Sequence, residues 1–155
     1  MKKMTIISLT LLLAFSACFL QRKAQKPHQK YLPDEFRNVY FGMPLEEFEK
    51  LKNGTDLEQS DLMSFRISIT EKEPEKTIKE VTYYFDNENE KPLYELIIEY
   101  KDATERDKVA RELLGQPNSG EEWAFDTGEG FLIKAWKFDK KLVVVGELPG
   151  TEWND

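Results

Sequence analysis

LMSFRISIT, residues 62–70, carries the clearest sign of a sheet in the sequence. Its apolar side chains stand at every second position from Met63 to Ile69, and polar side chains fill the positions between, from Ser64 to Thr70. This alternation is typical of a half-buried strand in an antiparallel sheet, because successive side chains of a strand point to opposite faces. The stretch therefore predicts a sheet with one face packed on a core and one face turned to solvent.

Further strand-like stretches follow along the chain. Residues 78–85 and 93–100 show a similar alternation, with Pro74 and Pro92 in the turns before them. Later in the chain, runs rich in aromatic and β-branched residues recur. They cover residues 121–126, 131–138 and 142–147. The sequence thus predicts six strands in two groups of three.

A helical pattern precedes the first group of strands. In residues 44–51, apolar side chains recur at every third position, at Leu45, Phe48 and Leu51. Pro44 suits the first turn of a helix, where its missing N–H has no partner to lose. We expect a short amphipathic helix with these three side chains on its buried face.

A second helical pattern, residues 102–114, precedes the other group of strands. Asp102, with Glu105 three residues later, has the spacing of a helix cap, and Gly115 is placed to end the helix. We expect an α+β fold in which tandem α-β-β-β units form one antiparallel sheet with two helices packed on one face. Residues 34–155 would form this single domain.

Residues 1–17 have the layout of a secretory signal peptide. Two lysines precede an apolar run from Met4 to Phe15, and small residues lead into the chain's one cysteine, Cys18. The sequence Phe15-Ser16-Ala17-Cys18 resembles a bacterial lipobox, after which signal peptidase II cuts and lipid is attached to the cysteine. The resemblance implies a lipid anchor on Cys18. Two alternatives remain: an uncleaved membrane anchor, or plain cleavage that leaves a free thiol.

Residues 18–33 are polar and basic without a hydrophobic period, so we expect a flexible tether. All 29 Asp and Glu follow Lys30, whereas six of the 22 Lys and Arg lie at or before it. The acidic body disfavours nucleic acid as a partner. The basic tether either sits on an anionic membrane surface or is a solvated linker. Phe19 replaces the aspartate that retains enterobacterial lipoproteins at the inner membrane, so we expect the outer membrane of a bacterial envelope, on its periplasmic or exposed side.

Residues suited to catalysis are scarce in the expected domain. The chain's one histidine, His28, falls in the expected tether, so no Ser-His-Asp or Cys-His arrangement is expected in the domain. There is no His/Cys cluster with zinc spacing and no glycine-rich phosphate loop after a strand. We therefore predict a protein that is not an enzyme and holds no metal or cofactor. The many carboxylates leave a hydrolase of envelope polymers as a less favoured alternative.

Aromatic side chains are the other candidates for function. Most fall on the apolar faces of strands and are expected in the core, but Tyr84, Trp136 and Phe138 fall on the opposite faces. Trp153, near the C-terminus, would either fold back onto the domain or remain available to a partner. An exposed aromatic patch would favour binding of a protein or ligand, whereas loops that cover both faces of the sheet would hide it.

Two fragments resemble the SmpA/OmlA family, which contains the small lipoprotein of the outer-membrane β-barrel assembly machinery. Gly42-Met43-Pro44-Leu45-Glu46-Glu47-Phe48 is similar to the Gly-Met-x-x-x-(Glu/Gln)-(apolar) helix opening of that family. Leu113-Leu114-Gly115-Gln116-Pro117, followed by Trp123-Ala124-Phe125, is similar to its Leu-Gly-x-Pro…Trp-x-(Tyr/Phe) segment. The related β-lactamase-inhibitor-like domains use the same helix-then-strands unit in tandem. The resemblance implies a non-catalytic envelope lipoprotein that binds or scaffolds another envelope protein. An inhibitor of a secreted enzyme is the alternative.

Overall fold

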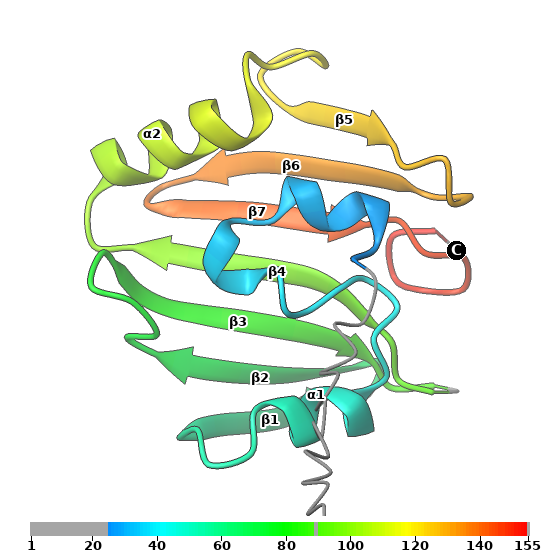
Figure 1. Cartoon of the computed structure of the whole chain (residues 1–155). Coiled ribbons are helices and arrows are strands. Elements are labelled where there is room, and N and C mark those ends of the chain that lie inside the picture. Colours follow the sequence, from blue (N-terminus) through cyan, green and yellow to red (C-terminus); the bar gives the residue numbers. More distant parts are fainter. Residues whose placement is uncertain (1–24, 89, 155) are drawn as a thin grey trace, which may run out of the picture.

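Seven antiparallel strands form a single sheet in the computed structural model, which describes residues 25–88 and 90–154 (Figure 1). Their order across the sheet is β1-β2-β3-β4-β7-β6-β5. The strands are β1 (Leu57–Met63), β2 (Arg66–Lys72), β3 (Ile78–Asp86), β4 (Leu93–Tyr100), β5 (Trp123–Asp126), β6 (Leu132–Phe138) and β7 (Lys141–Gly146).

Two meanders build the sheet, and they meet where β4 pairs with β7. The first meander runs from β1 to β4 and the second from β5 to β7, so the last strand of each lies at the junction. The pairing there is antiparallel, with Leu96 opposite Val144. The expected α+β fold with an antiparallel sheet is confirmed. The first unit has four strands instead of three, because β1 precedes the strands that were expected.

The prediction of one strand over residues 62–70 is wrong. β1 ends at Met63, a turn follows, and β2 begins at Arg66, with these two residues paired across the hairpin. Phe65 lies at this turn and is half-exposed, whereas Ile67 and Ile69 are buried as expected. The alternation did not reveal the turn, because Met63 and Phe65 continue the series of apolar residues at every second position. Met63 nevertheless pairs with Arg66 and so lies on the face opposite to Ile67 and Ile69.

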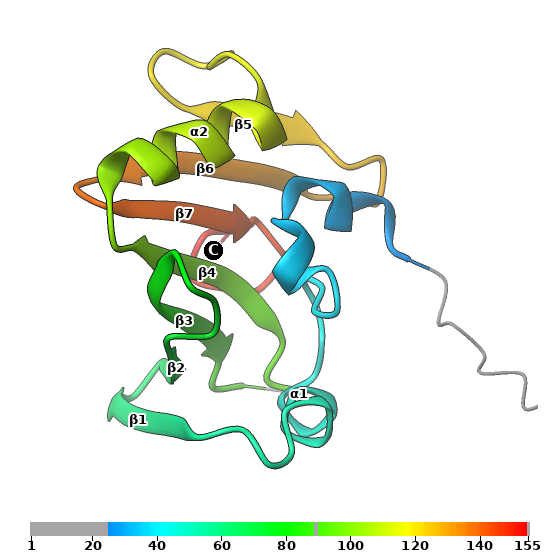
Figure 2. The same ribbon diagram turned by 60° about the vertical axis from the view of Figure 1, so that its left-hand side comes forward.

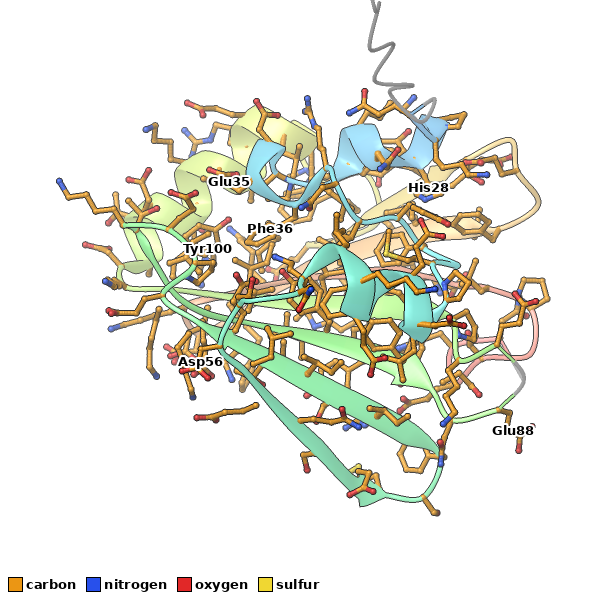
Figure 3. The ribbon with its side chains drawn as sticks, turned by 60° about the horizontal axis from the view of Figure 1, so that its bottom comes forward. His28, Glu35, Phe36, Asp56, Glu88 and Tyr100 are labelled. Carbon is orange, nitrogen blue, oxygen red and sulfur yellow. The ribbon has the colours of Figure 1, made fainter. Side chains whose placement is uncertain are left out.

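The helices lie together on one face of the sheet, as predicted (Figure 2). They are the 3-10 helices η1 (Pro27–Tyr31) and η2 (Asp34–Phe36) and the α-helices α1 (Leu45–Leu51) and α2 (Ala103–Leu114). Phe36 of η2 and Tyr100 of β4 are both buried in this layer (Figure 3), and the Phe36 ring packs edge to face on Tyr83 with centroids 6.4 Å apart. This face holds the hydrophobic core.

α1 packs on the sheet through Phe48. Its ring centroid lies 4.7 Å from that of Tyr83 and 5.1 Å from that of Phe85, both on β3. Leu45 is also buried, but Leu51 is exposed, which corrects the expectation that all three apolar residues face the core. Three residues fall 60° short of a full helical turn, so a repeat of three drifts off the buried face by its third member.

α2 begins and ends as the sequence predicts. The side chain of Asp102 accepts a hydrogen bond of 2.7 Å from the backbone N–H of Thr104, which has no partner inside the first turn. Gly115 follows the last helical residue with φ +74°, a conformation that glycine adopts without strain. Ala110 and Leu114 form the buried face of the helix.

The folded domain begins before residue 34, which moves the predicted boundary of the tether. η1 packs into the fold, with Gln29 and Leu32 buried. The Gln29 amide donates to the backbone oxygens of Arg37, at 2.7 Å, and Val39, at 3.0 Å. These bonds hold the chain in place from about Pro27 onward. The signal peptide and Cys18 lie outside the described residues.

His28 is also part of the domain and not of a tether (Figure 3). Its side chain is 2 % exposed, and its Nε2 accepts a hydrogen bond of 3.1 Å from the backbone N–H of Phe41. Because Nε2 is the acceptor, the ring proton sits on Nδ1, which donates to Glu129 Oε2 at 2.6 Å. The imidazole thus ties the start of the domain to the β5–β6 connection.

Candidate functional site

The second face of the sheet, opposite the helices, is the candidate site, and we call it the open face. Two rows of side chains define it across the paired strands. They are Ser68, Tyr84, Glu95, Val145 and Lys134 in one row and Thr70, Thr82, Ile97, Val143 and Trp136 in the other. The helices of the described chain all lie on the other side of the sheet (Figure 2).

A short C-terminal loop, residues 147–154, folds back over this face. It is held together from within, since Thr151 donates to the backbone oxygen of Leu148 and the Asn154 amide donates to that of Glu147 at 3.1 Å. The backbone N–H of Glu147 pairs with the backbone oxygen of Leu132 at the root of the loop. The loop is therefore a compact cover joined to the end of β7.

The four aromatic residues singled out in the sequence all reach this side of the sheet. Tyr84 lies on β3, Trp136 and Phe138 lie on β6, and Trp153 lies in the C-terminal loop. The rings of Trp136 and Trp153 meet edge to face, with centroids 5.4 Å apart. Trp153 thus folds back onto the domain but stays 38 % exposed. Phe138 is 68 % exposed near the end of β6.

The structure adds four residues that the sequence did not single out, beginning with Arg66. Its guanidinium lies 4.5 Å from the centre of the Tyr84 ring and donates from Nη1 to Glu152 Oε2 at 3.2 Å. The hydroxyl of Tyr94 donates to the same Oε2 at 2.6 Å. A cation and a phenol therefore hold one carboxylate of the C-terminal loop.

Tyr94 can reach this carboxylate because of an irregularity in β4. Tyr84 pairs with Glu95 and Phe85 pairs with Leu93, which leaves Tyr94 as an extra residue. Such a bulge lets two consecutive side chains turn to the same face. The alternation expected over residues 93–100 places Tyr94 on the face of Leu96 and away from Glu95, and the bulge shows that this is wrong.

Glu95 is the most buried carboxylate of the open face, at 4 % exposed. It accepts a hydrogen bond of 3.4 Å from the indole Nε1 of Trp153. Burial raises the pKa of Glu95 to about 6, while the Trp153 hydrogen bond and the charge of Arg66 act in the opposite direction. Burial likewise raises the pKa of Tyr94, and its hydrogen bond to Glu152 adds to the effect. The centre of the open face is thus a desolvated polar cluster.

A small hollow adjoins this cluster at the β1 side of the sheet. It has a volume of about 160 Å³ and is lined by Ser60, Met63, Arg66, Ser68 and Tyr84. Arg66 is therefore reachable from the hollow as well as from the C-terminal loop. The open face therefore has free space beside the Arg66 guanidinium, which contacts the Tyr84 ring.

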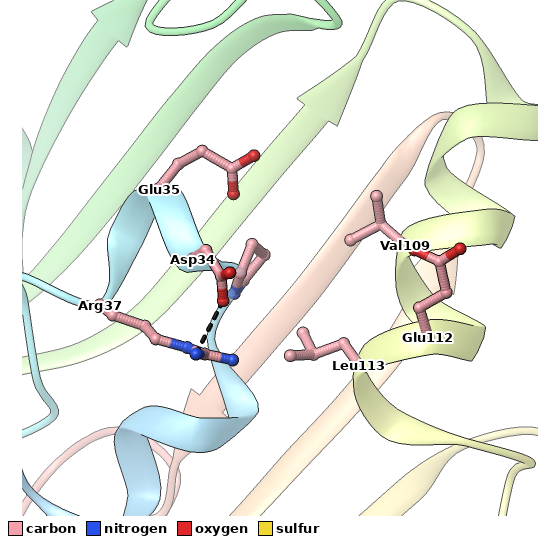
Figure 4. A pocket seen from close by; sticks show the side chains of 7 residues that line it. Asp34, Glu35, Arg37, Val109, Glu112 and Leu113 are labelled. Carbon is pink, nitrogen blue, oxygen red and sulfur yellow. Dashed lines mark ion pairs between the residues drawn. The ribbon is translucent and has the colours of Figure 1, made fainter.

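A second hollow, of about 290 Å³, lies on the helical side between η2 and α2 (Figure 4). Val109 and Leu113 of α2 face Asp34 and Arg37, which pair with each other at 2.8 Å. Arg37 also donates to the backbone oxygen of Leu32, so its charge and donors serve the fold. We regard this hollow as a seam between packed elements.

Residues 25–88 and 90–154 contain no group of three or more His, Cys, Asp or Glu side chains arranged to hold a metal ion. In the same part of the chain, no helix is both long and apolar enough to cross a membrane.

The fold and the site define an α+β domain with one packed face and one open, aromatic face. A scan of protein-family models gives no match, and neither the curated proteins nor the solved structures contain a match to this chain.

Proposed function

We propose that the protein is a lipid-anchored, non-catalytic binding module of a bacterial envelope, which presents the open face of its sheet to another envelope protein. The observation that carries the proposal is the grouping of Tyr84, Trp136 and Trp153 with Arg66 on that face. Tyr, Trp and Arg are the residue types that dominate protein–protein binding energy. They combine a large apolar surface with a polar end.

The anchor is proposed from the sequence. A charged start, an apolar run of about 18 Å if helical, and Phe15-Ser16-Ala17-Cys18 favour a cleaved and acylated N-terminus over a spanning helix, which needs about 30 Å. Because the domain begins near Pro27, only a few residues would separate the lipid from the fold. Such a short connection would hold the domain close to the membrane surface, which we propose to be the outer membrane.

Labelling of cells with a radioactive fatty acid tests the anchor. The full chain should incorporate label, and Cys18→Ser should not, because the thiol is the expected point of attachment. Equal labelling of both chains, or labelling of neither, contradicts the anchor.

Capture of partners from the detergent-solubilised native envelope tests the binding face. The baits are the full chain, Trp136→Ala, and Leu51→Ala as the matched control, because Leu51 is an exposed apolar residue on α1, behind the sheet. A partner retained by the full chain and by Leu51→Ala, and lost with Trp136→Ala, supports the proposal. A partner that all three capture equally, or no partner, contradicts it.

A further inference from the structure

Glu152 and Trp153 contact the sheet in the manner of a bound ligand. The Glu152 carboxylate takes hydrogen bonds from Tyr94, at 2.6 Å, and Arg66, at 3.2 Å. The Trp153 indole donates to Glu95 and stacks edge to face on Trp136. Each polar end of the pair Glu152-Trp153 thus has a matching group on the sheet.

The receiving groups come from three strands of the sheet and are rigidly placed. Arg66 lies on β2, Tyr94 and Glu95 on β4, and Trp136 on β6. Tyr94 and Glu95 are almost fully buried. A constellation held by regular strands is more precise than one held by loops. The site is therefore built by the sheet, and only its occupant belongs to the loop.

The occupant is joined to the domain through the end of β7. The C-terminal loop makes its turn through Gly150, with φ +74°, and its backbone hydrogen bonds beyond the root are internal. Glu152 and Trp153 are each about one-third exposed, and the hollow beside Arg66 adjoins their site. A competing segment can therefore approach Arg66 from the hollow.

We infer that the Arg66–Tyr94–Glu95–Trp136 constellation is a recognition site for a partner segment that carries a carboxylate followed by an indole. The chain's own Glu152-Trp153 occupies it until that segment displaces them. This inference rests on the proposed function and names the chemistry of the partner. Since 29 Asp and Glu follow Lys30, a highly acidic partner is repelled elsewhere on the domain. The partner's segment therefore carries its negative charge mainly at this position.

A free partner segment must compete for this site with the protein's own C-terminal loop. A short tether holds its ligand at an effective concentration on the order of millimolar. A free peptide should therefore bind much more tightly once the loop is shortened. The loop therefore competes with any partner segment, so only a segment of high affinity or high concentration displaces it.

The test uses a fluorescein-labelled peptide with the sequence of residues 148–155, LPGTEWND. Its binding is measured by fluorescence anisotropy to the full chain in detergent and to the chain ended after Gly150, which keeps β7 and Leu148. We expect the shortened chain to bind the peptide at least about tenfold more tightly than the full chain. Replacing the peptide's Glu by Gln or its Trp by Ala should weaken binding by about tenfold or more.

A matched pair of protein variants tests the receiving side. In the shortened chain, Arg66→Gln should weaken peptide binding by about tenfold. Lys72→Gln is the control, because Lys72 lies on the same strand and open face but pairs with Glu80 and Glu58 at a distance from the loop. Equal effects of the two substitutions overturn the inference.

Other results also overturn it. These are equal peptide binding by both chain lengths, or no binding by the shortened chain at up to about 1 mM, the concentration that a tether supplies. If circular dichroism shows the shortened chain unfolded, the full chain with Trp153→Ala takes its place with the same expectations. Sedimentation could instead show that the full chain forms a dimer in which each copy's C-terminal loop occupies the other copy's site. A second copy would then be the occupant, and the inference of a different partner would be overturned.

The two proposals fail separately. An envelope partner whose capture persists in excess LPGTEWND peptide overturns this inference and leaves the proposed function standing. Peptide binding as expected, without any envelope partner, contradicts the proposed function alone.

Discussion

Replacing Glu95 by Gln should change how the stability of the domain depends on pH. The Glu95 carboxyl is buried between Trp153 and the sheet, with the charges of Arg66 and Glu152 nearby. Burial raises its pKa from the ordinary value of 4.5 to about 6. Gln keeps an oxygen that can accept from the Trp153 indole but has no charge to desolvate.

The sign and size of the effect follow from this pKa. The folded state binds the Glu95 proton more tightly than the unfolded state, so the extra stability is present below about pH 4.5 and is lost as the pH rises through about 6. One pH unit corresponds to about 1.4 kcal/mol. Relative to Glu95→Gln, the native chain should therefore be more stable against unfolding at pH 4 than at pH 7, by about 2 kcal/mol.

Urea unfolding of the full chain in detergent, followed by tryptophan fluorescence at several pH values, measures this difference. The matched control is Glu99→Gln, on the same strand and face. The hydrogen bond from Lys79 lowers the pKa of Glu99, so its contribution should fall on acidification, with the opposite sign. If the difference between the native chain and Glu95→Gln stays constant from pH 4 to pH 7, or has the same sign as that for Glu99→Gln, the reasoning about the buried cluster is refuted.

Three further substitutions test the packing, each by urea unfolding. His28→Ala should cost about 2–4 kcal/mol, because it leaves the buried N–H of Phe41 and the Glu129 carboxylate without their partner; a loss below about 0.5 kcal/mol would show that the N-terminal segment is not part of the domain. Gly146→Ala should cost about 1–3 kcal/mol, since its methyl group would stand 2.7 Å from the Phe41 ring; an unchanged stability would contradict that contact. Asp102→Ala should cost about 1 kcal/mol through loss of the α2 cap, and Asn at the same position should restore most of it.

The sequence predicts the fold better than it predicts the site. Alternation and helix caps locate six of the strands and both α-helices, because each of these signals is local. The turn before Arg66 was hidden because Met63 and Phe65 continue the apolar spacing of Ile67 and Ile69 in the sequence, although Met63 lies on the opposite face. β1 was missed because its sequence, LEQSDLM, shows no alternation of apolar and polar residues. Glu58, Gln59 and Asp61 are exposed on this edge strand.

For the site, alternation correctly places Tyr84, Trp136 and Phe138 on the open face, since that is a property of each strand alone. Arg66, Tyr94, Glu95 and Glu152 were missed, because their roles depend on contacts between distant segments. One local signal was present: Glu95 interrupts an apolar run near the start of β4, LYELIIEY. The buried His28 was misplaced because a polar, basic stretch gives no sign that its side chains are satisfied by backbone groups.

The outer edges of the sheet bear on how copies of the protein behave when crowded on a surface. At one edge, β1 exposes the charged side chains of Glu58 and Asp61, and at the other, β5 spans only four residues. Unpaired strand edges can form hydrogen bonds with the edge strands of neighbouring molecules. Like charges and short edge strands oppose this pairing. Lateral fibril growth is thereby disfavoured even where the proposed lipid anchor confines many copies to two dimensions.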